Sequence, residues 1–202
     1  MASLLVVIAT NVIVSVLGFR ALADPGRRDR FLFVPHQVAE GRNGLGMLLA
    51  HFSHSGWPHL LFNMIALASF AQTVLDVLGP ARFLLIYVTA GLGSDLVVFA
   101  LHRDDPSYRC LGASGSVFGI MMAAVVLDPG TFIVLFIAPV PIPGPVFMVG
   151  YAIVSLVLIA RKRHGGISHE GHLGGAVLAL AVTALLAPRG LEPLIRWFTR
   201  WI

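Results

Sequence analysis

The segment Gly112-Ala-Ser-Gly-Ser-Val-Phe-Gly119 decides the expected fold, because it opens an apolar run that continues to Leu127. The polar residues 102–109 precede it. We therefore expect Ser114 in the first turn of a membrane-embedded helix, where free backbone N–H groups and the positive end of the helix dipole point toward it. Small neighbours leave room for another backbone or a bound chain. Alone, the Gly-x-Ser-Gly pattern favours packing between helices over catalysis, and the rest of the chain reverses that order.

Composition places the chain among helical membrane proteins. Of its 202 residues, 57% are hydrophobic and 12% are charged, whereas soluble domains carry about 25% charged residues. Several apolar runs approach or exceed the roughly 18–20 residues that cross a bilayer. We therefore expect an all-α, multi-pass protein of the cell membrane. The net charge of +4 fits basic loops beside anionic lipid better than binding to nucleic acid.

Metal and disulfide chemistry is not expected. Cys110 is the only cysteine, which excludes an internal disulfide. The sequence contains neither a CxxC nor an HExxH pattern, so we predict no structural metal. His51, His54 and His102 lack a third ligand at matching spacing and are interpreted as residues that structure the loops.

Six apolar segments are expected to cross the membrane as one domain covering residues 1–202. Breaks such as Gly79-Pro80 and Asp128-Pro129-Gly130 separate them. The N-terminal run has no basic leader and no small-residue cleavage site, so we interpret it as a retained span rather than a signal peptide. The expected spans are residues 3–22, 58–78, 82–101, 112–127, 145–160 and 169–187.

Three further segments do not read as spans. The connection from residue 24 to 56 starts polar, yet its apolar groups at 31–34 and 47–49 could lie at the membrane surface. Residues 131–144 are expected to form an irregular connection, because their prolines forbid one continuous helix. In the tail, residues 190–202, apolar and charged side chains fall on different helical faces, which predicts an amphipathic helix in the membrane interface.

Alternate crossing would bring the N-terminal ends of the second, fourth and sixth spans to one side of the membrane. Polar residues gather at these three ends: His59 and Asn63, Ser114, and residues 169–172. Polar side chains inside spans are costly and therefore indicate function. The clustering favours a site built from three helices.

Ser114 and His172 are the candidate reacting pair. A serine hydroxyl is a poor nucleophile until a base takes its proton, and a neutral imidazole can accept one. The small residues 174–176 would let the sixth span approach another helix closely enough for this contact. Equally open is a role for His172 as a hydrogen-bonding partner of a neighbouring helix.

His59 and Asn63 are four residues apart and share one helical face. Their side chains could donate hydrogen bonds to a developing oxyanion, beside the N–H groups at the start of the fourth span. The alternative is a buried polar pair that satisfies loop backbone. Their expected position at the depth of a serine and a histidine favours the catalytic interpretation.

Three segments together resemble the signatures of the rhomboid intramembrane serine proteases: residues 54–64 (His-Ser-Gly-Trp-Pro-His-Leu-Leu-Phe-Asn-Met), residues 112–119, and residues 172–175 (His-Leu-Gly-Gly). The resemblance implies a six-helix bundle that hydrolyses a peptide bond in or beside a substrate's transmembrane helix, without metal or cofactor. It also implies roles for individual residues: Ser114 as nucleophile, His172 as base, His59, Asn63 and the Ser114 N–H as oxyanion hole, Phe118 packed on the imidazole, Gly112 leaving room at the hole, and Gly115 and Gly175 as motif glycines.

The chain departs from the family pattern in places. Many members carry Trp-Arg where this chain has Leu45-Gly46, a glutamate where it has Leu75, and a glycine where it has Ala179. These changes concern loop anchoring and packing rather than the dyad. His169 is a rival base, and Asp95 is a rival third member of a triad, although a hydrogen bond within the bundle is the favoured interpretation of Asp95.

The sequence leaves one alternative open for the membrane orientation and another for the function. The family places the active-site side outside the cytoplasm, whereas the larger number of basic residues on that side points the other way. We keep the family's orientation. An inactive rhomboid-like protein that binds transmembrane clients is the alternative function, and a transporter is disfavoured because no inverted repeat is visible. The expected partners are transmembrane protein substrates and the lipid bilayer.

Overall fold

The computed structural model describes residues 1–135, 139–161 and 166–200. Helices make up most of it, as the predicted all-α fold class requires, and that fold class is confirmed. In chain order, the elements are α1 (Ala2–Leu22), the 3-10 helix η1 (Arg28–Phe31), α2 (Pro35–Ala39), α3 (Gly44–Ala50), α4 (Trp57–His102), α5 (Ser114–Leu127), β1 (Phe132–Val134), β2 (Pro141–Pro143), α6 (Gly144–Ala160), α7 (His169–Leu186) and α8 (Glu192–Thr199).

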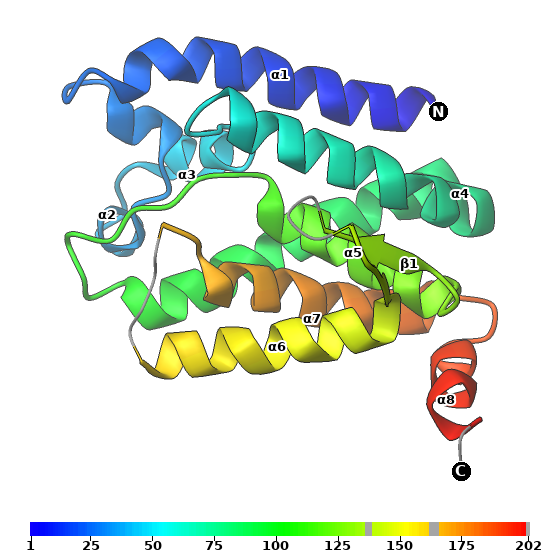
Figure 1. Ribbon diagram of the computed structural model, residues 1–202. Coiled ribbons are helices and arrows are strands. Elements are labelled where there is room, and N and C mark those ends of the chain that lie inside the picture. The colour runs from blue at the N-terminus through cyan, green and yellow to red at the C-terminus, as the bar shows by residue number, and fades with distance from the viewer. Residues whose placement is uncertain (136–138, 162–165, 201–202) are drawn as a thin grey trace.

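Helix α4 consists of two arms that meet at Gly79. This residue has φ +80° and ψ 172°, and Pro80 follows it. Glycine takes a positive φ at little cost, and proline cannot donate the backbone hydrogen bond that would continue the first arm. Figure 1 shows the first arm leading away from α3 and the second arm returning toward the end of the molecule where α2 lies. The arms coincide with the segments predicted at 58–78 and 82–101.

Length and composition identify the helices that suit a bilayer. Among the described residues, α1, α4 and α7 are long and apolar enough to cross a membrane, and α5 and α6 are shorter apolar helices. With α4 counted as two arms, all of these segments begin and end within two residues of the six predicted spans. The number of crossings itself stays a prediction.

Helix α5 lies at the centre of the bundle, against α4 and α7. Its residues Ile120, Ala123 and Val126 are completely buried, which explains why its sequence has no polar face. Small residues bring the neighbouring helices close: a Cβ on Gly175 would collide with the backbone carbonyl of Gly115. This contact between small residues sets the distance between the first turn of α5 and the second turn of α7.

Helices α1 and α6 lie on opposite sides of the bundle (Figure 1) and expose apolar side chains. On α6, Val146, Ile153 and Leu156 are each at least half exposed, and on α1 Leu5 and Leu17 are similarly open. Such faces suit contact with lipid chains. The tail forms α8 between Glu192 and Thr199, with Ile195 and Phe198 exposed; residues 201–202 of the predicted tail lie outside the described residues.

Two predictions about connections need correction. Residues 131–144 are not wholly irregular, because β1 and β2 pair antiparallel with Ile133 opposite Ile142. Proline breaks a helix but keeps its carbonyl as an acceptor, so Pro141 and Pro143 can take part in a two-stranded sheet. Residues 136–138 lie outside the described residues. The apolar side chains at 32–34 are buried in the protein rather than exposed at its surface. The backbone of Phe33 forms a bridge with Cys110, which holds this segment against the loop before α5.

Candidate active site

Ser114 is the first residue of α5, and the backbone before it is held in a glycine conformation. Gly112 has φ +129°, and a Cβ there would lie 3.0 Å from Cε1 of His59. The N–H of Gly112 donates to the carbonyl of Ala50 at 2.9 Å, which anchors this turn to the end of α3. Both the conformation and the space therefore require glycine at position 112.

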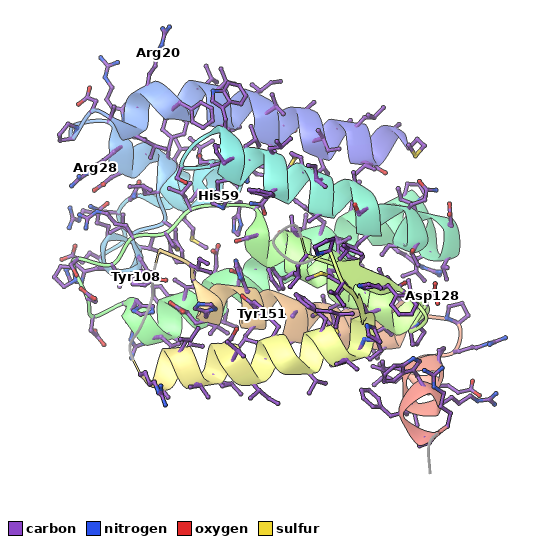
Figure 2. The ribbon with its side chains drawn as sticks, in the orientation of Figure 1. Arg20, Arg28, His59, Tyr108, Asp128 and Tyr151 are labelled. Carbon is purple, nitrogen blue, oxygen red and sulfur yellow. The ribbon has the colours of Figure 1, made fainter. Side chains whose placement is uncertain are left out.

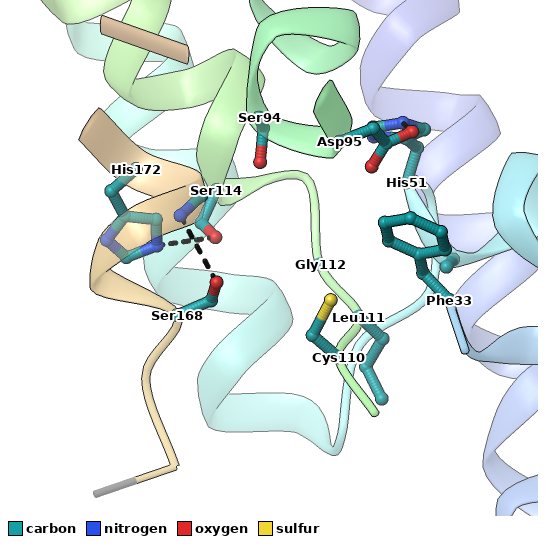
Figure 3. A pocket seen from close by; sticks show the side chains of 12 residues that line it. Phe33, His51, Ser94, Asp95, Cys110, Leu111, Gly112, Ser114, Ser168 and His172 are labelled. Atoms are coloured by element: carbon teal, nitrogen blue, oxygen red, sulfur yellow. Dashed lines mark hydrogen bonds and ion pairs between the residues drawn. The ribbon is translucent and has the colours of Figure 1, made fainter. Parts of the chain in front are cut away.

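His172 comes from the first turn of α7 and meets Ser114 directly. Its Nε2 lies 2.7 Å from Ser114 Oγ (Figure 3). Ser168 caps α7, because its hydroxyl accepts from the N–H of Gly171 at 3.2 Å. His172 is 9% exposed. The structure thus brings together the two residues that the sequence proposes as nucleophile and base.

Two aromatic rings fix the position of this imidazole. Phe118, one turn after Ser114, stacks on His172 with ring centroids 4.3 Å apart and planes 15° from parallel. Tyr151 comes from α6 and lies between α6 and α7 (Figure 2); its hydroxyl oxygen is 2.5 Å from His172 Nδ1. His169, the rival base, has its Nδ1 3.5 Å from the Tyr151 oxygen and 3.3 Å from Ser155 Oγ.

Sequence reasoning missed Tyr151. A signal existed, since Tyr151 and Ser155 are polar residues four apart in an otherwise apolar segment and so share a helical face. No motif marks this segment, and only the packing of α6 against α7 shows which residue the face meets.

A cavity of about 440 Å³ opens beside Ser114. One wall is the start of α4, with His59 and Asn63, and Phe118 lines the cavity near the dyad. The backbone N–H of Ser55 points to His59 Nδ1 at 3.4 Å. With Nδ1 accepting, the neutral ring carries its proton on Nε2, so His59 can donate into the cavity. Asn63 uses one amide hydrogen on the carbonyl of His59 at 2.9 Å and lines the same cavity.

Asp95 does not meet His172. Its carboxylate lies 2.7 Å from Nε2 of His51, and Figure 3 shows this pair on the other side of the turn at Gly112. The other loop histidines also bond within the protein: His54 Nδ1 lies 2.9 Å from Ser15 Oγ, and His102 Nε2 lies 2.8 Å from a carboxylate oxygen of Glu170.

Cys110 lines the same cavity as Ser114. Burial, followed by the charges of Asp95 and Glu170, raises the pKa of its thiol well above the usual range. The thiolate is the reactive form of cysteine, so Cys110 is a poor rival to the serine. Among the described residues, no group of three or more histidine, cysteine or carboxylate side chains is placed to hold a metal ion; chemistry without metal stays a prediction.

Comparison with known proteins gives consistent matches. The family model "Rhomboid domain" matches residues 42–189. A human protein, presenilin-associated rhomboid-like protein, mitochondrial, is 31% identical over 164 residues, which cover 74% of this chain and 41% of the human protein. Rhomboid protein 1, mitochondrial, of Saccharomyces cerevisiae is 30% identical over 158 residues, covering 73% of this chain and 45% of the yeast protein. The chain therefore spans less than half the length of these relatives.

Proposed function

The chain belongs to the rhomboid family, and from this premise we propose that it is an intramembrane serine endopeptidase that cleaves transmembrane-helix substrates. The observation that carries the proposal is the 2.7 Å contact between Ser114 Oγ and His172 Nε2 inside an apolar bundle. A serine and a histidine at this distance form the pair that acyl transfer requires.

The proposed reaction follows from the positions of these atoms. Ser114 Oγ–H donates to His172 Nε2, and the oxygen attacks the scissile carbonyl while the imidazole takes the proton. The imidazolium then returns that proton to the leaving amine, which gives an acyl-enzyme on Ser114. A water molecule, deprotonated by His172, attacks the ester carbonyl and releases the new carboxylate and the free serine.

An oxyanion hole would stabilise both tetrahedral intermediates. The donors proposed for it are the His59 Nε2–H, the free amide hydrogen of Asn63 and the backbone N–H of Ser114. Removal of one such donor typically slows acyl transfer by about 10²–10³-fold. The positive φ of Gly112, which lets the chain pass close to His59, supports this arrangement.

The wider setting belongs to the same proposal. Residues 1–202 act as one membrane domain with six crossings, and substrates are single transmembrane helices that unwind near one end so that a peptide bond reaches the cavity beside Ser114. The protein is embedded in a membrane. The named relatives are mitochondrial, whereas the sequence analysis expects the cell membrane. Cell fractionation that separates mitochondrial membranes from the cell membrane decides which of the two contains the protein.

The test is labelling with a serine-directed fluorophosphonate probe in detergent. We expect the wild type to be labelled, Ser114→Ala to lose the label and His172→Ala to lose most of it. Ser116→Ala is the matched control, since Ser116 is a buried serine of the same helix, and it should keep the label. Label that survives Ser114→Ala would refute the dyad, and a folded wild type without label would favour the alternative, an inactive protein that binds transmembrane clients.

A further inference from the structure

We propose that Tyr151 is a positioning residue of the dyad, which holds His172 in the tautomer that can take the proton of Ser114. This inference rests on the proposed function and extends it from α5 and α7 to a third helix, α6.

Both ring nitrogens of His172 have a partner. Nε2 lies 2.7 Å from Ser114 Oγ and Nδ1 lies 2.5 Å from the Tyr151 hydroxyl oxygen. A neutral imidazole carries a single proton. With that proton on Nδ1, Nε2 is free to accept from Ser114. With the proton on Nε2, His172 would donate to Ser114 and could not act as a base. The partner at Nδ1 therefore decides whether the pair is competent.

The contacts of Tyr151 are compatible with the competent arrangement. A phenol can donate or accept, and its oxygen also lies 3.5 Å from Nδ1 of His169, a nitrogen that is itself 3.3 Å from Ser155 Oγ. When Tyr151 donates toward His169, its oxygen lone pairs face His172 and accept from Nδ1–H. In this arrangement, His169 acts on the dyad through Tyr151. This assigns a use to the histidine that competes with His172 in the sequence.

The position of Tyr151 suits a membrane interior. In the Ser–His–Asp arrangement, a carboxylate accepts from the histidine Nδ1–H. A charged carboxylate would be costly among apolar helices, whereas a phenol oxygen accepts the same hydrogen bond without a charge. Tyr151 also packs its ring on Phe118, with centroids 4.5 Å apart, and Phe118 stacks on His172. Phenylalanine at position 151 would keep these ring contacts and remove only the hydroxyl.

Labelling kinetics with the fluorophosphonate probe can isolate that hydroxyl. For Tyr151→Phe, we expect the maximal rate of labelling to fall about 3- to 10-fold, the equivalent of one hydrogen bond, with the probe concentration at half-maximal rate unchanged. Tyr87→Phe is the matched control. It removes a buried phenol that accepts from Asn11 of α1 at 3.2 Å, away from the dyad, and it should label at the wild-type rate.

The tautomer itself can be measured by ¹⁵N NMR of histidine-labelled protein in detergent, with the His172 signals identified by their loss in His172→Ala. We expect a protonated Nδ1 in the wild type and a larger share of the other tautomer in Tyr151→Phe. A wild-type His172 protonated on Nε2, or a labelling rate unchanged by Tyr151→Phe, would overturn the inference. With an unchanged rate, loss of label in Ser114→Ala would leave the proposed function standing, whereas a wild-type His172 protonated on Nε2 would also count against its role as base.

Discussion

Ser114 and His172 were identifiable in the sequence because each stands in a short motif at the start of an apolar segment. Their neighbours differ in whether a sequence motif could identify them. Phe118 lies one helical turn from Ser114, so its stacking on His172 follows from a motif on the same helix. Tyr151 lies on α6, where the chain shows no motif, and its contact with His172 depends on how two helices pack. Local spacing predicts the first kind of partner and not the second.

His54 gives a prediction about pH at the residue scale. Burial, with the charge of His59 as the second cause, lowers its pKa from 6.5 to about 3. Below about pH 6.5 the unfolded chain takes up a proton at this site while the folded protein does not, so the stabilisation present above pH 6.5 is lost as the pH falls toward 3. The thermal unfolding midpoint in detergent should therefore fall between pH 7.5 and pH 5.

The matched variant for this measurement is His54→Asn, whose amide can still bond to Ser15 but does not titrate. Its midpoint should depend less on pH over the same interval than that of the wild type. Equal losses in the two proteins would show that His54 does not couple folding to protons.

At the scale of elements, glycine contacts determine how closely α5 and α7 approach. The sequence indicated close packing at Gly175, and the structure shows its partner, the backbone of Gly115. The same scale shows where sequence reasoning failed. Proline at positions 141 and 143 correctly excluded a continuous helix, but a helix breaker does not reveal whether the segment then pairs as a strand, because that depends on residues 132–134 across the hairpin.

Gly175→Ala tests this packing. The added methyl group would collide with the backbone of Gly115, which cannot move as a flexible side chain does. We expect a loss of about 1–3 kcal/mol in stability, as for other overpacked cores, seen as a lower thermal midpoint. The labelling of Ser114 should fall as well, because α5 and α7 separate.

Gly150→Ala is the control for this prediction. Gly150 lies on α6, and a Cβ there would meet nothing within 4 Å. Alanine is a better helix former than glycine, so this variant should match or exceed the wild-type midpoint. If Gly175→Ala behaves like Gly150→Ala, the close approach of α5 and α7 is not what holds the dyad together.

For the whole molecule, six crossings require both termini on one side of the membrane and the dyad end on the other. Figure 1 shows α8 at the end of the bundle where α1 begins. Composition and apolar run lengths predicted the class of protein and its number of segments. They could not predict that α5 lies in the centre while α1 and α6 cover opposite sides, since similar apolar sequences suit lipid and protein neighbours alike.

Topology is tested with reporters in intact vesicles. Reporters fused before Met1 and after Ile202 should report the same side, which the family's orientation makes cytoplasmic. Asp104→Cys, in the exposed loop before α5, should react with an impermeant thiol reagent from the opposite side in a Cys110→Ser background. Termini on different sides would contradict six crossings, and a C-terminus outside the cytoplasm would reverse the orientation.

The most direct test of the central claim is to locate the covalent adduct by tandem mass spectrometry after fluorophosphonate treatment of the folded wild type. The account predicts one modified residue, Ser114, with the modification strongly reduced in His172→Ala. An adduct on a different residue, or equal modification of Ser114 with and without His172, would contradict it.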